Sequence, residues 1–371
     1  MSKTSAVFSE RDKKILYHFA KQCSRLKHSC LLDTNVLTPS NFCEEKEKFL
    51  QSKTYNPQFI YKKTPKNIKH GFDQLQKYLA SIDLPKDLAN YFFEYLDNLE
   101  LLSLTISAIG TKSFAAYSQR LFRSYTSHTH ETLQQLPDIN FLEDEKHTLH
   151  TAEKIAAIFH NYLQQYDELS QYAISLDSFN DHTIRVGENR LIIGSRVKRT
   201  TENVRRLIVH EIESHIMQRH NARLSKNPLL KLIRTEEHEM LAEGLAVFNE
   251  IYTKTITRKA YNIYFYRLKA VAMLQKSFRE IYDYLTNFLT PHQAFIITAR
   301  VKRGMADTSQ PGGFPKDAAY LLGYNRINEY VSHGGSLSSL YIIRQPEYGK
   351  LLAKYDLLTD ANYVLPKFLE K

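Results

Sequence analysis

The sequence predicts a mainly helical α+β fold, and two features of its pattern indicate that class. Long stretches carry apolar residues at intervals of three and four, the spacing of one face of an α-helix. Only one short stretch alternates apolar and polar residues in the manner of a strand. With 371 residues and 43% hydrophobic content, the chain can bury a large core. We therefore expect one large domain, or two that pack closely together.

The helical pattern recurs along almost the whole chain, and each stretch is long enough for several turns. Gly334 and Gly335 are predicted to end the last strong helix, after which residues 336–371 return to the core. In chain order, the predicted helices cover residues 10–31, 67–82, 85–109, 144–172, 203–221, 236–255, 260–289, 291–303 and 316–331.

Two stretches interrupt this pattern and are predicted to be connectors. Residues 41–61 contain Pro57 and scattered turn-forming residues, and residues 129–140 are rich in polar and turn-forming side chains. The second connector divides the chain into an N-terminal helical region, residues 1–135, and a second region, residues 136–371, that contains the motifs described below.

Residues 182–194 are the exception to the helical pattern and predict a β-hairpin. Alternating apolar residues stand on both sides of Gly187-Glu188-Asn189, a sequence typical of a tight turn. The hairpin directly precedes the segment with the most informative chemistry.

That segment reads His210-Glu211-Ile-Glu-Ser-His215 and follows the apolar run Leu207-Ile-Val. Two histidines with a carboxylate beside the first supply nitrogen ligands for a catalytic zinc ion and a base for its water. The spacing is one residue longer than in HExxH, whose histidines share a helix face. Five residues of regular helix would turn the second imidazole about 140° away from the first. We therefore predict a π-type turn between the histidines, which would return them to one face; a surface helix that happens to carry histidines is the alternative.

A second helical segment, residues 236–250, offers a third ligand. Glu243 is followed by Gly244, which permits close approach to another helix. Two histidines and a glutamate would leave a fourth zinc position for water, as in catalytic rather than structural sites. Glu239, one turn earlier, is the competing third ligand and otherwise a candidate to orient a histidine. His220 could bind only if the helix ended first, because ten residues of helix span about 15 Å.

Three motifs follow one another along the chain: the segment 207–215, the element Ala242-Glu-Gly-Leu-Ala246 and the Gly-rich string 300–323. In this order they resemble the microtubule-associated tyrosine carboxypeptidases and their bacterial relatives, the flavohemoglobin expression-modulating QEGLA-motif proteins. The resemblance runs from about residue 41 to about residue 358. It departs from the family pattern at Glu213-Ser214, where Gly-Thr is frequent, and at Ala242, where Gln is frequent.

The resemblance implies a zincin-like metallopeptidase core with a small hairpin or sheet beside the metal helix. It also implies that His210, His215 and Glu243 bind Zn²⁺ and that Glu211 is the catalytic base. Animal members remove the C-terminal tyrosine of α-tubulin, so the resemblance implies a zinc carboxypeptidase that removes a C-terminal tyrosine or another aromatic residue. A zinc endopeptidase and a non-catalytic regulator that keeps the fold are the alternatives.

The remaining chemistry requires groups that bind the substrate. Tyr320 and Tyr324, four residues apart, are candidates to stabilise the oxyanion, although with 24 tyrosines in the chain either could be a packing residue. An exopeptidase also needs a cation for the terminal carboxylate. The candidates flank the Gly-Gly loop and are Arg300, Lys302, Arg303 and Lys316. Each could instead belong to a solvated basic face.

The strand that begins at Asn189 is a candidate to hold the substrate. We expect residues 189–194 to bind its backbone as an added strand, with a purely structural hairpin as the alternative.

Composition limits the partners. The net charge of +10 arises from 50 Lys and Arg against 40 Asp and Glu, spread along the chain without a nucleic-acid motif. We therefore expect no nucleic-acid partner, and a peptide or protein C-terminal tail of acidic character would suit the charge.

The location of the protein is inferred from what the sequence does not contain. The longest uncharged stretch, residues 101–111, is too short to span a membrane, and residues 1–14 resemble no signal peptide. Three cysteines, Cys23, Cys30 and Cys43, suggest reduced structural thiols rather than a disulfide framework. We expect a cytoplasmic protein.

Overall fold

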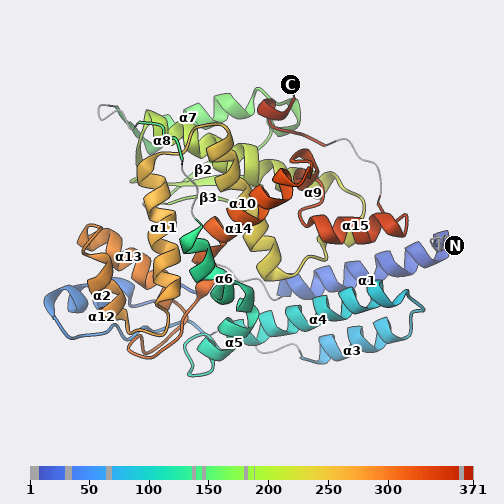
Figure 1. Cartoon of the computed structure of the whole chain (residues 1–371), viewed down its shortest axis with the longest axis horizontal. Coiled ribbons are helices and arrows are strands. Elements are labelled where there is room, and N and C mark those ends of the chain that lie inside the picture. The colour runs from blue at the N-terminus through green and yellow to red at the C-terminus, as the bar shows by residue number, and fades with distance from the viewer. Residues whose placement is uncertain are drawn as a thin grey trace.

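The computed structural model confirms the mainly helical fold with small sheets (Figure 1). It describes residues 8–29, 36–63, 69–135, 139–143, 148–178, 183–187, 189–358 and 363–370. The α-helices are α1 (Glu10–Ser29), α2 (Phe42–Gln51), α3 (Lys69–Ala80), α4 (Lys86–Ser107), α5 (Phe114–Leu121), α6 (Arg123–Gln134), α7 (Ala152–Leu163), α8 (Thr201–Leu207), α9 (Met217–Leu224), α10 (Thr235–Tyr252), α11 (Arg258–Ala272), α12 (Phe278–Leu285), α13 (Pro291–Lys302), α14 (Ala319–Ser332) and α15 (Pro346–Lys354).

Shorter helical elements connect these helices. The segment η2 (Ile208–Ile216) is a π-helix, continuous with α8 before it and α9 after it. The others are the 3₁₀ turns η1 (Asp167–Leu169), η3 (Pro228–Lys231), η4 (Pro315–Ala318), η5 (Ser338–Tyr341) and η6 (Lys367–Leu369).

The strands form two small sheets. In one sheet, β1 (Leu149–Thr151) pairs with β5 (Lys198–Thr200) in antiparallel orientation. In the other, the order is β2 (Ala173–Asp177), β4 (Arg190–Gly194), β3 (Ile184–Val186). The predicted hairpin is present, because β3 and β4 pair antiparallel. The parallel partner β2 was not predicted; its exposed and half-buried pattern shows no clear alternation in burial.

The helices surround a central pair, α10 and α14 (Figure 1). The helices α1, α3 and α4 lie side by side at one end of the molecule, and α7 lies with the strands near η2. Buried apolar side chains from the first helix to the C-terminal segment belong to one cluster, which includes Phe19, Phe122, Ile212 and Leu352. The N-terminal helices therefore pack on the rest of the chain, while the division at residue 135 stays a prediction.

Both predicted connectors were wrong, because each contains a helix. In residues 41–61 the run of Glu and Lys favours helix α2, which buries Phe49 completely. In residues 129–140 the helix α6 continues to Gln134, although Ser, Thr and His are poor helix formers. Burial of Tyr125 against α10 stabilises α6, since its hydroxyl donates to the carbonyl of Glu236.

Two predicted helices were too long. The stretch 260–289 contains α11 and α12, separated where Ser277 caps the second helix. Ser277 and Glu280 form a capping box, an S-x-x-E signal that the sequence contains. The stretch 144–172 begins outside the described residues and then forms β1, α7 and η1. Here β1 is a short strand whose pairing partner, β5, is distant in sequence.

The C-terminal segment returns to the core as predicted. The helix α14 ends at Ser332, just before Gly334. Tyr341, Tyr348 and Leu352 are then fully or almost fully buried. The Asn221 amide donates to the carbonyl of Tyr341 and to that of Val364, so this segment is fastened to the end of the metal-motif helix.

The structure bears on two expectations from the composition, which concern membrane-spanning helices and the cysteines. Among the described helices, none is long and apolar enough to cross a membrane. Cys23 is buried and Cys43 is exposed, and both are free thiols. Cys30 lies outside the described residues.

The crossing of α10 and α14 depends on two glycines. A Cβ atom placed on Gly244 would lie 2.2 Å from the carbonyl carbon of Gly323. A Cβ atom on Gly323 would lie 2.0 Å from the carbonyl oxygen of Met240. Because backbone atoms of both helices meet here, neither position has room for a side chain. The contact brings Glu243 of α10 and Tyr320 of α14 into one region.

We predict that Gly244→Ala lowers the free energy of unfolding by about 1–3 kcal/mol, because the new methyl group meets backbone that cannot move away. Thermal or urea unfolding measures the loss. Gly71→Ala in α3 is the matched control, since its Cβ would meet only the flexible end of Leu26 at 2.9 Å. If the two substitutions had equal effects, the close crossing would not be the stabilising feature that we describe.

Candidate metal centre

The predicted widened turn is present. Residues 208–216 form a π-helix, so the five-residue step from His210 to His215 returns to the same face. The imidazole centroids are 4.9 Å apart, with their planes at 83°. A regular helix would have pointed the two rings apart. The π-helix therefore makes the HExxxH spacing compatible with a shared ligand.

Side-chain hydrogen bonds, one within the helix and one from α10, support this turn. The Ser214 hydroxyl donates to the carbonyl of Val209, five residues earlier. The buried amide of Asn249, from α10, donates to the Ser214 oxygen at 2.8 Å and to the hydroxyl of Tyr341 at 2.8 Å. Asn249 of α10 thus links the wide turn to Tyr341 of the C-terminal segment.

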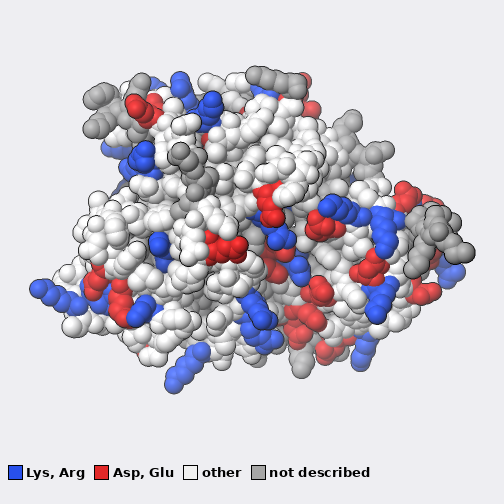
Figure 2. Space-filling model, viewed as in Figure 1, with Lys and Arg blue, Asp and Glu red and all other residues white. Residues whose placement is uncertain are grey.

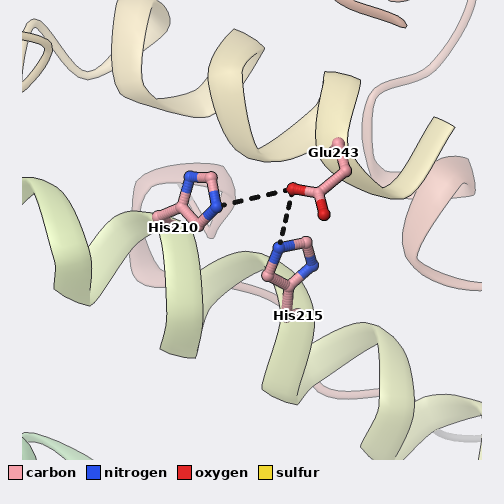
Figure 3. Close-up of side chains that lie close together, drawn as sticks. All are labelled: His210, His215 and Glu243. Carbon is pink, nitrogen blue, oxygen red and sulfur yellow. Dashed lines mark ion pairs between the residues drawn. The ribbon is translucent and has the colours of Figure 1, made fainter. Parts of the chain in front are cut away.

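Glu243 faces both histidines from the neighbouring helix α10 (Figure 3). Its Oε2 atom lies 3.7 Å from His210 Nε2 and 3.5 Å from His215 Nε2. Candidate ligand atoms of the three residues all lie within 4.8 Å of one another. They are the one such His, Cys, Asp or Glu group in the described part of the chain.

The three side chains fit a metal ion better than they fit one another. The separations of 3.5 and 3.7 Å are too long for hydrogen bonds, and Glu243 Oε2 is buried without a hydrogen-bond partner. Ligand atoms about 2.0–2.2 Å from a tetrahedral zinc ion lie about 3.3–3.6 Å from one another. The arrangement is therefore close to that of a ligand set, and the triad can hold a divalent metal ion.

The charges of the triad favour binding of a cation. Burial alone lowers the pKa of His210, but the carboxylates of Glu243 and Glu250 outweigh it and raise that pKa to about 10. Burial raises the pKa of Glu243, yet the two histidines hold it well below its usual range. Positive charge is stabilised at this point, whether carried by protons or by a metal ion.

Glu250, which is not among the predicted site residues, orients His210. The Nδ1–H of His210 donates to Glu250 Oε1 at 2.6 Å, so Nε2 is the nitrogen that faces Glu243. The same oxygen accepts from Arg206 at 2.7 Å and from the Tyr264 hydroxyl at 2.9 Å. Glu250 is fully buried, and these partners lower its pKa although burial acts to raise it.

A signal for Glu250 and Arg206 was present in the sequence. Glu250 lies seven residues after Glu243, beyond the apolar run Leu245-Ala-Val-Phe248, and this spacing places both carboxylates on one helix face. Arg206 precedes His210 by four residues, also on one face. Tyr264 has no comparable signal, because it comes from α11 and reaches the site only through packing.

Neither of the alternative metal ligands, Glu239 and His220, joins the triad. Glu239 forms an ion pair with Lys316 at 2.6 Å instead of facing the imidazoles. His220 lies one turn beyond the π-helix, on α9, and burial lowers its pKa. Glu211, the predicted base, is next to His210 on the π-helix and is 8% exposed.

The two predicted tyrosines lie in different surroundings. The Tyr320 ring stacks on Tyr264 at 4.8 Å and lies 6.4 Å from the His210 ring. Its side chain is half-buried, and burial raises the pKa of its hydroxyl, which therefore keeps its proton. Tyr324 is 6% exposed and packs on Phe248 at 6.2 Å. The structure brings Tyr320, but not Tyr324, to the triad.

The four cations predicted to bind a substrate carboxylate differ in whether other groups already occupy them. Lys302 is fully buried, and its ammonium donates to the carbonyls of Leu274, Gln310 and Gly312. It therefore holds the Gly-Gly loop in place instead of binding a substrate. Lys316 is paired with Glu239. Arg300 and Arg303 lie around the buried Asp317, together with Arg267, which the sequence analysis did not select.

Residues 189–194 cannot accept a substrate strand as predicted. The strand β4 pairs with β2 on one side and with β3 on the other, so both of its edges are used. Asn189 is exposed in the turn that precedes β4. The strand with a free edge near η2 in the described sheet is β3, which contacts the π-helix.

These features define a mainly helical protein with a candidate metal centre made of two histidines from a π-helix and a glutamate from a crossing helix. The family model described as microtubule-associated tyrosine carboxypeptidase matches residues 47–370, nearly the whole chain, and the chain belongs to this family. It is therefore a member of a carboxypeptidase family, as the sequence motifs led us to expect. Comparison with individual curated proteins finds none that matches.

We predict that Glu250→Gln lowers Zn²⁺ affinity about 10- to 100-fold, because the acceptor that orients His210 loses its charge. Competition with a chromophoric chelator measures the affinity. Glu239→Gln is the matched control, since Glu239 pairs with Lys316 and should change affinity little. If Glu239→Gln lowered the affinity more than Glu250→Gln, then Glu239, and not Glu250, would be the carboxylate that supports the metal site.

Proposed function

We propose that this chain is a zinc-dependent metallocarboxypeptidase that removes a single C-terminal residue from a peptide or protein tail. The observation that carries the proposal is the triad of His210, His215 and Glu243, gathered by a π-helix within a chain of the tyrosine carboxypeptidase family. Three protein ligands leave a coordination position free, as hydrolysis requires.

In the proposed mechanism, a bound zinc ion would acidify a water molecule and polarise the scissile carbonyl. Glu211 accepts the proton as water attacks and then delivers it to the leaving amine. Its place beside His210 on the π-helix supports this role. Glu250, held by Arg206 and Tyr264, keeps the His210 ring oriented. The Tyr320 hydroxyl donates to the oxyanion that develops on the carbonyl oxygen.

The proposed substrate is a tail that ends in tyrosine or another aromatic residue. The family description names tyrosine and microtubules. The half-buried ring of Tyr320, which stacks on the buried Tyr264 beside His210, offers an aromatic contact of suitable chemistry. The substrate class that this description favours is a protein C-terminal tail, and we propose that the enzyme meets it in the cytoplasm.

An acidic tail would match the net charge of +10. On the face drawn in Figure 2, Lys and Arg side chains are dispersed among Asp and Glu and do not form one broad basic patch. That distribution gives no support to a nucleic-acid partner and suits short-range recognition of a tail.

We predict that Glu211→Gln leaves Zn²⁺ bound but lowers turnover about 10²- to 10⁴-fold, because the proton acceptor is lost. His210→Ala, His215→Ala and Glu243→Ala should each release the metal. Elemental analysis of the purified variants and mass spectrometry of digested peptides measure the two effects. Glu213→Gln is the control, since its side chain instead accepts from Tyr162 at 2.6 Å and should preserve turnover. Unchanged zinc content in all three ligand variants would reject the ligand set.

We predict that Tyr320→Phe lowers kcat about 10- to 10³-fold with little change in KM, because its hydroxyl acts only in the transition state. Steady-state kinetics on a peptide with a C-terminal tyrosine measure both constants. The control is Tyr324→Phe, which should leave both nearly unchanged. An increase in KM alone would instead indicate a role in ground-state binding.

A further inference from the structure

A cluster of three guanidinium groups surrounds one carboxylate beside the metal centre. Asp317, which is 1% exposed, accepts from Arg300 Nε at 2.6 Å and from its second fork nitrogen at 2.7 Å. Arg267 Nε lies 3.8 Å from Asp317 Oδ2, and an Arg303 nitrogen lies 3.8 Å from Oδ1. The three arginine side chains are only 13–31% exposed.

The cluster carries more positive than negative charge. Three arginines share the single charge of Asp317, which leaves an excess of two positive charges in this part of the described chain. Glu243 also acts on Arg300, but it faces the two histidines. Because buried charges are costly unless paired, the cluster is complementary to an anion.

Of the three guanidinium groups, Arg267 is the one whose position suits that anion best. Arg300 already uses two nitrogens of its fork on Asp317. Arg303 covers the ring of Phe314, which packs against Phe122 of the helical core. The Nε atoms of Arg267 and Arg303 are both buried without a hydrogen-bond partner, but of the two only Arg267 lies over the ring of Tyr320, beside the metal centre.

Arg267 is also placed close to the metal centre. Its guanidinium lies 5.0 Å over the ring of Tyr320, whose ring is 6.4 Å from that of His210. One aromatic ring therefore separates Arg267 from a proposed metal ligand.

We propose that Arg267 binds the free α-carboxylate of the last residue of the substrate, with Tyr320 supporting its guanidinium and the Arg300–Asp317 pair holding the cluster in place. The inference rests on the proposed peptidase function and deepens it. A cation that binds the terminal carboxylate restricts cleavage to the last peptide bond and so separates an exopeptidase from an endopeptidase. An acidic side chain near the end of the tail offers the same chemistry, and the test distinguishes the two sources.

The experiment uses the zinc-loaded full chain and three peptides that end in tyrosine. The first has a free terminal acid, the second is its C-terminal amide, and the third has the free acid but Gln in place of each Glu. The wild-type protein should cleave the first and third at similar rates and the amide at least about 10- to 100-fold more slowly, the range expected for loss of a charge-assisted contact. Preference for the first peptide over the third, with no loss on amidation, would overturn the assignment by making the side chain the anion.

In Arg267→Gln, kcat/KM for the free acid should fall about 10- to 100-fold, mainly through KM, while the slow cleavage of the amide is unchanged. The preference for acid over amide should then disappear. Arg258→Gln is the matched control, because Arg258 begins the same helix but covers Phe141 at 4.4 Å. Persistence of the preference in Arg267→Gln would overturn the proposal.

Two further measurements keep failure of the anchor separate from failure of the peptidase. Zinc content and thermal unfolding of Arg267→Gln should match the wild type, and if this variant does not fold, Arg267→Lys replaces it and should retain part of the preference. Binding of the acid and amide peptides to the Glu211→Gln protein, measured by calorimetry, should differ about 10- to 100-fold without any turnover. Equal affinity for the two peptides there would contradict the role of Arg267, while wild-type protein that cleaves none of the peptides would instead contradict the proposed function.

Discussion

The arrangement of the site depends on the π-helix between Ile208 and Ile216. A regular helix would separate the two imidazoles by more than a third of a turn, whereas the wider turn places them on one face. The extra residue leaves an irregular backbone that needs support. The Ser214 hydroxyl, the Asn249 amide and the Tyr341 hydroxyl provide it from three parts of the chain. Formation of the ligand set is therefore coupled to the packing of α10 and of the C-terminal segment.

A second constraint places the remaining groups. The glycines 244 and 323 let α10 and α14 approach until their backbones touch. Because Glu243 adjoins the first glycine and Tyr320 precedes the second by three residues, one contact positions both a proposed ligand and a proposed oxyanion donor. The stacked rings of Tyr264 and Tyr320 then connect the metal centre to Arg267. The proposed metal binding, oxyanion stabilisation and carboxylate recognition would thus share one set of packed helices.

The chain uses buried charge in two ways around this centre. Glu250 is surrounded by Arg206, Tyr264 and His210, so its charge is matched and it can hold an imidazole rigidly. Asp317 is outnumbered by arginines, so its surroundings keep an unmatched positive charge. The first arrangement suits a fixed structural role, and the second suits a ligand that brings its own negative charge.

The sequence by itself determined the helical class, most helix positions, the hairpin and the two histidines with their need for a wide turn, because these depend on spacing within one segment. It also indicated Glu243, since a glycine beside a carboxylate on a helix with an apolar face permits close approach to another helix. It did not show α2, α6 or strand β2, whose patterns are weak and whose stability comes from distant partners. Only the tertiary structure assigned Lys302 to the Gly-Gly loop, placed β4 between two other strands, and brought Arg267 and Tyr264 from α11 to the metal centre. These residues come together because helices from distant segments of the chain cross one another. A periodic pattern within one segment cannot predict which helices will cross.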